Sequence, residues 1–258
     1  MKNILKIICI AGLFAWAYPV SAAEKTSLLK VDWSFKGIFG KFDRGSLQRG
    51  YQVYTEVCAS CHSMKYLSYR NLAEKGGPEF SIEQVKAIAA SFEVTDGPNS
   101  DGEMFERPAK LSDKFVKPYE NVKAAQAANG GAYPPDMSVL AKARSGGVDY
   151  IYSVLLGYED PPSGVTLDDG VYYNKYMYGN NIKMAQPLSD GLIEYTDGTI
   201  ASEEQMAKDV STFLMWAAEP HLEARHKMGF KAILYLIILT ILVYFSMKKI
   251  WSRIESKV

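Results

Sequence analysis

The sequence VCASCHSM, at residues 57–64, is the feature that most restricts what this chain can fold into. Cys58 and Cys61 stand three positions apart, and His62 follows directly. A Cys-x-x-Cys-His pattern is typical of a covalently attached c-type haem, but a cysteine pair can also form a redox disulfide or half of a zinc site. The rest of the sequence distinguishes these three interpretations.

Residues 1–23 have the pattern of a bacterial secretory signal peptide. Lys2 and Lys6 begin the segment, an apolar run follows, and the small residues of VSAA precede a cleavage site near Ala22 or Ala23. A permanent N-terminal anchor is the alternative. We consider it weaker because the apolar run is short and is interrupted by Lys6.

Cleavage of this segment would remove Cys9 and leave Cys58 and Cys61 as the only cysteines. Two cysteines cannot complete a Cys₄ zinc site. In a thiol oxidoreductase the pair should open a helix that follows a strand, where the thiol pKa is lowered. Here the pair ends a predicted helix. The predicted signal peptide also directs the chain to the compartment in which haem is attached, so we favour the haem interpretation.

Residues 228–247 are apolar throughout except for Lys231. A helix of about 20 such residues can cross a bilayer, and the Lys231 ammonium can reach back to the interface. Four basic residues and one acid follow, which predicts a cytoplasmic tail at residues 248–258 and a periplasmic domain at residues 24–227. A buried core helix is the alternative, but it does not explain the basic cluster.

Residues 24–228 contain 22 lysines and arginines and 28 aspartates and glutamates. This acidic balance argues against nucleic acid as a partner and is compatible with a basic protein partner. Four acids, Glu159, Asp160, Asp168 and Asp169, are candidates for such a docking surface. The alternative for each is an ordinary solvated side chain.

Helical periodicity is clear in three segments. One runs from about Arg44 into the cysteine pair, with Leu47, Tyr51 and Tyr54 on one face. The second and third, residues 81–92 and 202–220, each begin with a Ser-x-x-Gln capping-box pattern. We expect the apolar stripe of the third helix (Met206, Val210, Phe213, Leu214 and Ala217) to pack on the face of the first.

Two long segments, residues 93–108 and 159–191, have no sustained period. Loops of this length in a compact domain are commonly functional, disordered or organised by something other than the chain. A large buried cofactor would organise them. The pattern as a whole predicts an all-α domain with long loop insertions and one C-terminal transmembrane helix.

An iron atom bound by His62 needs a sixth ligand on the other haem face. Met64 is too close in sequence to cross that plane, and Met206 and Met215 belong to a predicted helix. From the residues alone we prefer Met184, in the stiff segment NNIKMAQPL, with Met177 next; Met104 and Met137 stay open. A Met/His pair raises the reduction potential of a haem.

Four segments together resemble the cytochrome c1 family, the haem-bearing subunits of ubiquinol:cytochrome c reductase (the cytochrome bc1 complex). They are RGYQVYTEVCASCHSMKYLSYRNL, AAQAANGGAYPPDMSVLAKARSGGVDYIYSVLLGYEDPP, IKMAQPL and DVSTFLMWAAEPHLEARHKMGFK. The similarity extends over nearly the whole mature sequence. The sequence departs from familiar family members at ANGG and at GYEDPP. Neither departure affects a proposed ligand.

The resemblance implies a class I cytochrome c-like fold and one haem c, with Met184 as the sixth ligand. It also implies that Arg144 bonds a haem propionate and that Asn129, Pro135 and Tyr150 line the pocket. Without the resemblance, Arg144 would be interpreted as a solvated charge, Pro135 as a turn residue and Tyr150 as a core aromatic.

The resemblance further implies a redox subunit of ubiquinol:cytochrome c oxidoreductase in the bacterial inner membrane. Such a subunit accepts electrons from a Rieske iron-sulfur protein, passes them to a cytochrome c, and is associated with cytochrome b. A membrane-tethered cytochrome acting as an independent carrier is the alternative. His221 and His226 stand five apart just before the apolar run, and we assign them to the membrane interface rather than to metal or haem ligation.

Overall fold

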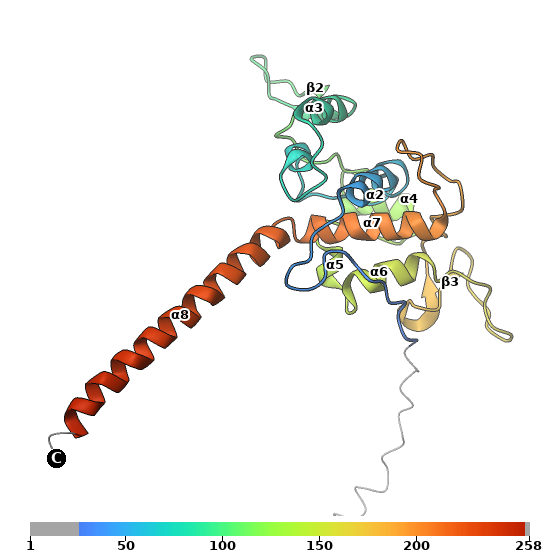
Figure 1. Cartoon of the computed structure of the whole chain (residues 1–258). Coiled ribbons are helices and arrows are strands. Elements are labelled where there is room, and N and C mark those ends of the chain that lie inside the picture. The colour runs from blue at the N-terminus through green and yellow to red at the C-terminus, as the bar shows by residue number, and fades with distance from the viewer. Residues whose placement is uncertain (1–25, 256–258) are drawn as a thin grey trace, which may run out of the picture.

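The computed structural model describes residues 26–255; the predicted signal peptide and the last three residues of the tail lie outside this range. The chain is mostly helical (Figure 1). Its α-helices are α2 (Arg44–Glu56), α3 (Ile82–Ala90), α4 (Val122–Ala128), α5 (Leu140–Ala143), α6 (Gly147–Leu155), α7 (Glu203–Ala218) and α8 (Leu222–Glu255). Short 3₁₀ turns are η1 (Cys58–Ser60), η2 (Tyr69–Ala73) and η3 (Tyr178–Asn180).

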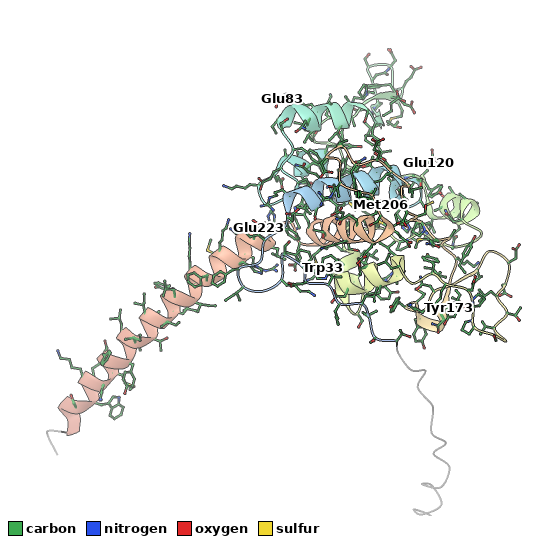
Figure 2. All side chains as sticks on the ribbon, turned by 45° about the vertical axis from the view of Figure 1, so that its right-hand side comes forward. Trp33, Glu83, Glu120, Tyr173, Met206 and Glu223 are labelled. Atoms are coloured by element: carbon green, nitrogen blue, oxygen red, sulfur yellow. The ribbon has the colours of Figure 1, made fainter. Side chains whose placement is uncertain are left out.

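The helices α2 and α7 form the centre of the core, as predicted. Figure 1 shows α2 on one side of α7 and α5 and α6 on the other. Phe213 of α7 contacts the rings of Tyr51 and Tyr54 of α2, with centroids 5.8 and 5.9 Å away. Figure 2 places the fully buried Met206 in this central layer.

A glycine permits the close approach of these two helices. A Cβ on Gly50 would lie 2.2 Å from the carbonyl oxygen of Asp209 and 2.7 Å from the Cβ of Phe213. Beside this contact the guanidinium of Arg49 donates to both carboxylate oxygens of the fully buried Asp209, at 2.8 and 3.2 Å. The ion pair compensates the cost of burying the carboxylate between the helices.

The predicted helix starts are correct at Ser81 and Ser202, whose side chains accept from the backbone N–H three residues later. At α3 the capping box is complete, because the backbone N–H of Ser81 donates to the Gln84 side chain at 2.8 Å. At α7 it is not. The amide nitrogen of Gln205 donates to Asp209 at 2.9 Å, so this side chain extends toward the buried carboxylate and its oxygen does not accept from the Ser202 N–H.

The segments without a period contain two antiparallel hairpins. Strands β1 (Glu93–Asp96) and β2 (Phe105–Pro108) form one, and β3 (Tyr172–Tyr173) and β4 (Asn181–Ile182) form the other. The short helices α4, α5 and α6 were not predicted. Each has nine residues or fewer, and none begins with the Ser-x-x-Gln pattern that marked the equally short α3.

The chain before α2 packs along α6. The indole N–H of Trp33 donates to the buried carboxylate of Asp149 at 2.6 Å, and the ammonium of Lys36 lies 3.3 Å from the same group. Trp33 also contacts Phe35 and Tyr152 through their rings. This segment therefore closes the core on the side of α7 opposite α2.

The last helix, α8, extends away from the body as one continuous rod (Figure 1). It includes the predicted span of residues 228–247 and continues beyond both ends of that span. Its apolar stretch is long enough to cross a membrane by length and composition, and none of it is buried against the body. The alternative of a buried core helix is therefore wrong. Only residues 219–221 separate α8 from α7.

Candidate haem site

Cys58 and Cys61 lie on one 3₁₀ turn at the end of α2. The backbone N–H groups of Cys61 and His62 both donate to the carbonyl of Cys58, at 3.1 and 2.9 Å, which closes the turn. Both cysteines are half-buried free thiols. A single turn thus presents two thiols with an imidazole directly after them, which suits a group attached by two thioethers.

The environment of Cys58 does not suit a thiol oxidoreductase. Burial raises the pKa of its thiol to about 12, and the neighbouring Cys61 acts in the same direction. A redox-active dithiol needs a thiolate and a lowered pKa. Within residues 26–255, moreover, no three His, Cys, Asp or Glu side chains gather in the way a zinc site would require.

His62 is held in the tautomer that an iron ligand requires. Its Nδ1 lies 2.8 Å from the carbonyl oxygen of Pro135, and because a carbonyl can only accept, Nδ1 has the proton and Nε2 has the free lone pair. Burial lowers the pKa of His62, against the opposing influence of the Pro135 bond and the Asp136 charge, so the ring is neutral near pH 7. These residues fit an axially bound haem.

The segment at residues 135–138 pairs with the segment that follows His62. The N–H of Met137 donates to the carbonyl of Ser63 at 2.8 Å, and the N–H of Tyr66 donates to the hydroxyl of Ser138 at 3.0 Å. The Asp136 carboxylate accepts from both segments. No sequence pattern singled out Asp136, because these contacts join residues more than 70 positions apart.

The methionines occupy different environments. Met64 and Met206 are fully buried in the core, as a packing role requires, and Met137 is also buried there. Met104 is 61% exposed next to the hairpin strand β2. Met177 is half-buried, and its sulfur accepts a hydrogen bond from the Tyr150 hydroxyl at 3.1 Å.

Met184, the preferred ligand, is half-buried in the extended segment after β4. Its carbonyl accepts a hydrogen bond from the hydroxyl of Tyr158 at 3.0 Å. Tyr158 is itself half-buried and forms an isolated β-bridge with Asn174. The backbone of the Met184 segment is therefore fixed to the chain that follows α6, a contact that the sequence did not indicate.

Of the predicted pocket residues, Pro135 contacts His62 directly through its carbonyl. Tyr150 is half-buried, and burial raises its pKa against the opposing effect of the positive charge of Arg144. Arg144 is exposed, and its guanidinium donates to the adjacent Ala143 carbonyl at 3.3 Å. Asn129 ends α4 and donates to Tyr119 and Ala125.

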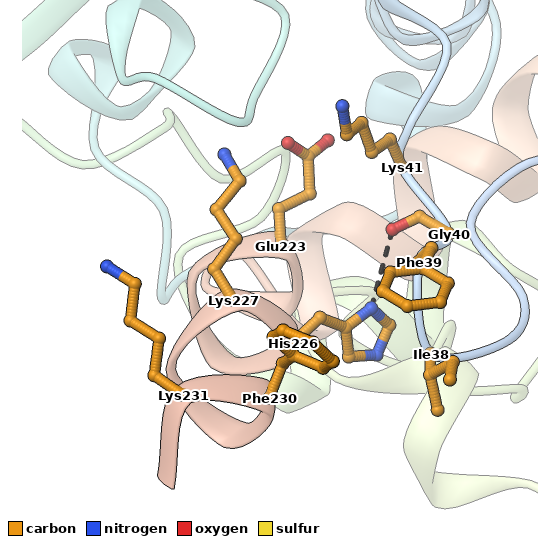
Figure 3. A pocket seen from close by; sticks show the side chains of 9 residues that line it. All are labelled: Ile38, Phe39, Gly40, Lys41, Glu223, His226, Lys227, Phe230 and Lys231. Carbon is orange, nitrogen blue, oxygen red and sulfur yellow. Dashed lines mark hydrogen bonds between the residues drawn. The ribbon is translucent and has the colours of Figure 1, made fainter. Parts of the chain in front are cut away.

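Figure 3 shows the start of α8, where a pocket of about 330 Å³ opens between the helix and the loop at residues 38–41. The Nδ1 of His226 lies 3.4 Å from the carbonyl of Gly40, and the ring of Phe39 packs 5.9 Å from that of Phe230. His221 is exposed at the helix end. Among the described residues, no hydrogen bond joins His221 or His226 to His62.

The four acids proposed for docking are all exposed. Glu159 lies 3.2 Å from the Lys175 ammonium, so its charge is partly compensated. Asp160, Asp168 and Asp169 form no ion pair in the part of the chain that is described. All four carboxylates are accessible to solvent, and their use for docking stays a prediction.

A helical domain that ends one helix with two thiols and a fixed imidazole, and ends its chain with a long apolar helix, has the design of a membrane-anchored c-type cytochrome. Residues 33–254 match the model of the Cytochrome C1 family. The chain belongs to the cytochrome c1 family.

Three known proteins illustrate the relationship. The chain is 46% identical to "Cytochrome c1" of Rhodospirillum rubrum, over 99% of this chain and all of that one. It is 47% identical to "Cytochrome c1-2, heme protein, mitochondrial" of Solanum tuberosum, over 96% of this chain and 95% of the relative. It is 52% identical to "Cytochrome b/c1" of Bradyrhizobium diazoefficiens over 85% of this chain, and the match covers only 35% of that longer protein.

Proposed function

We propose that this chain is the electron-transfer subunit of a bacterial cytochrome bc1 complex, passing single electrons from a Rieske iron-sulfur protein through one covalently bound haem c to a cytochrome c. The observation that supports this most strongly is the fixed His62 tautomer directly after the cysteine turn. A bound haem supplies a one-electron ferrous/ferric couple. Quinol oxidation belongs to partner subunits, and no general base is needed here.

The chain's own residues hold and tune that group. Cys58 and Cys61 would provide the two thioether sulfurs, and His62 and Met184 would bind the iron. Arg144, which is exposed and hydrogen-bonded only to the adjacent Ala143 carbonyl in the described chain, would bond a haem propionate. Asn129, Pro135 and Tyr150 form the pocket walls.

For the domain organisation, we propose a signal peptide at residues 1–23, a periplasmic haem domain at 24–227, a membrane span at 228–247 and a cytoplasmic tail at 248–258. The chain is then a single-pass protein of the bacterial inner membrane. The exposed apolar surface of α8 supports this and provides a packing face for cytochrome b.

A reduced-minus-oxidised visible spectrum of the purified full chain tests the cofactor. We expect the α-band of a c-type haem, retained after acidic acetone extraction because the attachment is covalent. A spectrum without that band would contradict the haem proposal.

The Met184→Leu variant tests the sixth ligand. A leucine has no donor sulfur, so we expect the haem to stay attached while its reduction potential falls substantially. Met177→Leu is the matched control, because the Met177 sulfur already accepts from Tyr150. If the potential changed in the control and not in Met184→Leu, the ligand would be Met177.

Purification in mild detergent through a C-terminal tag tests the partners. We expect a cytochrome b and a Rieske protein to co-purify with the chain. The alternative is an independent tethered carrier, for which a flexible linker would be expected; here residues 219–221 alone join α7 to α8. Recovery of the chain without those two proteins would favour the carrier.

A further inference from the structure

We infer that Asp136 is a positioning residue for the axial histidine: its carboxylate ties the Pro135 carbonyl to the segment after His62 and thereby helps to set the reduction potential. This inference rests on the proposed haem function. Asp136 forms no hydrogen bond with Cys58, Cys61 or His62, and it would act through Ser63, Lys65 and Pro135.

The contact that needs positioning is the 2.8 Å bond between His62 Nδ1 and the Pro135 carbonyl. Pro135 has no backbone N–H, so this residue cannot be held by a hydrogen bond of its own donor. The side chain of the next residue, Asp136, holds this segment in place together with the Met137–Ser63 and Tyr66–Ser138 hydrogen bonds. A hydrogen bond from the other ring nitrogen of a ligating imidazole fixes the orientation of the ring and raises its basicity.

One carboxylate joins the two segments. Asp136 Oδ2 accepts from the Ser63 hydroxyl at 2.8 Å and from the Lys65 N–H at 3.0 Å. Both donors belong to the short segment that follows His62. The other oxygen, Oδ1, accepts from the N–H of Ser138 at 3.0 Å in its own segment. Hydrogen bonds to an ionised acceptor are about twice as strong as those between neutral groups.

The charge of Asp136 has a second effect in the same direction. Burial raises its pKa, but the bonds from Lys65, Ser138 and Ser63 outweigh this and lower it, so the group is ionised near pH 7. Its negative charge raises the pKa of His62, against the larger lowering by burial. A negative charge near the axial ligand stabilises the ferric state, and a firm Nδ1–H bond does the same by raising imidazole basicity.

The decisive variant is Asp136→Asn in the haem-loaded full chain. It keeps the side-chain shape but removes the charge and one acceptor, so both effects raise the reduction potential. In a redox titration followed by the visible spectrum, we expect the ferrous-to-ferric ratio at a fixed ambient potential to rise at least threefold. An unchanged ratio would overturn the inference.

Asp113→Asn is the matched control. Asp113 also secures a loop, since its carboxylate accepts from the Lys110 N–H at 2.7 Å and from Arg107, but these partners lie outside both segments that meet at His62. We expect the control to change thermal stability and leave the ferrous-to-ferric ratio as in the unmodified chain. An equal rise in both variants would also overturn the inference.

If Asp136→Asn fails to fold, Ser63→Ala replaces it. This change removes one donor to Oδ2 and keeps the charge, so we expect a smaller rise in the same direction. No rise would then count against the inference. A lack of c-type spectrum in the unmodified chain would instead contradict the proposed function, so the two failures are distinguishable.

Discussion

A tyrosine hydroxyl donates to the backbone carbonyl of each proposed iron ligand. Tyr54 bonds the carbonyl of His62 at 3.2 Å, and Tyr158 bonds that of Met184 at 3.0 Å. In both cases the side chain of the ligand stays available for the metal while its backbone is fixed. Preorganisation of this kind reduces the entropy lost when a ligand is immobilised.

The Tyr158→Phe variant should loosen the Met184 segment. The change removes one hydroxyl and leaves the ring, so we expect a weaker sulfur–iron bond, loss of part of the near-infrared sulfur-to-iron band and carbon monoxide binding to the reduced protein. Tyr152→Phe is the control, because its hydroxyl bonds Glu204 at 3.1 Å. Equal carbon monoxide binding in both variants would refute a specific role for Tyr158.

The raised pKa of Cys58 gives a pH-dependent prediction for chain produced without haem and bearing Cys61→Ser. The thiolate is the reactive form, and burial, the larger cause of the pKa of about 12, remains when the smaller contribution of Cys61 is removed, so very little thiolate exists at pH 8. Against an exposed cysteine with pKa near 8.5, alkylation by iodoacetamide should be roughly 10³-fold slower and should accelerate as the pH rises. A rate equal to that of free cysteine would show that the site is open without haem.

Among individual residues, only those that belong to a local sequence pattern could be predicted from the sequence. Cys58, Cys61 and His62 are adjacent in the chain, and their chemistry follows from spacing alone. Pro135 came only from the family resemblance, and Asp136 and Tyr158 were missed. Their importance depends on contacts with residues 26 to 73 positions away, and such pairing leaves no periodic signal in one sequence.

Among the elements, α2 and α7 cross at very close range at Gly50. Gly50→Ala would place a methyl group 2.2 Å from the carbonyl oxygen of Asp209, so the helices must separate. We expect a loss of about 3 kcal/mol in the free energy of unfolding, since overpacking of a well-filled core costs roughly 1–3 kcal/mol and the clash here is with backbone. Chemical denaturation measures it.

Gly45→Ala in the same helix provides the control. A Cβ at Gly45 would meet only the end of the Arg49 side chain and the Asp43 carboxylate, at 3.2 and 3.3 Å. There the better helix propensity of alanine, up to about 1 kcal/mol, should offset the crowding. A loss as large as that of Gly50→Ala would argue against the close crossing as the cause.

The longer helices were predictable because several turns repeat the same apolar stripe between recognisable caps. Residues 147–155 form α6 despite a glycine at its first position, and α5 has only four residues. Their helical state depends on packing against α7 rather than on local propensity. The Gln205 contact shows the same effect, because a buried carboxylate redirects a side chain that local rules assign to the cap.

For the whole molecule, the division between body and α8 predicts how the chain behaves when cut. The apolar stretch of α8 has no buried contact with the body. A chain ending at Lys227 should therefore fractionate as a soluble periplasmic protein with an unchanged haem spectrum, as measured after cell fractionation. Recovery of that shortened chain in the membrane would indicate a second anchoring surface.

Ion pairs link the junction between α7 and α8 to the rest of the domain. Glu219, at the end of α7, accepts from Lys142 of α5 and from Arg225 of α8, and Glu223 of α8 accepts from Arg44 of α2. These ion pairs join the start of α8 to α2, α5 and the end of α7. In the proposed membrane-anchored subunit they would hold the haem site in one orientation relative to the membrane, so the redox partners would have to move to the site.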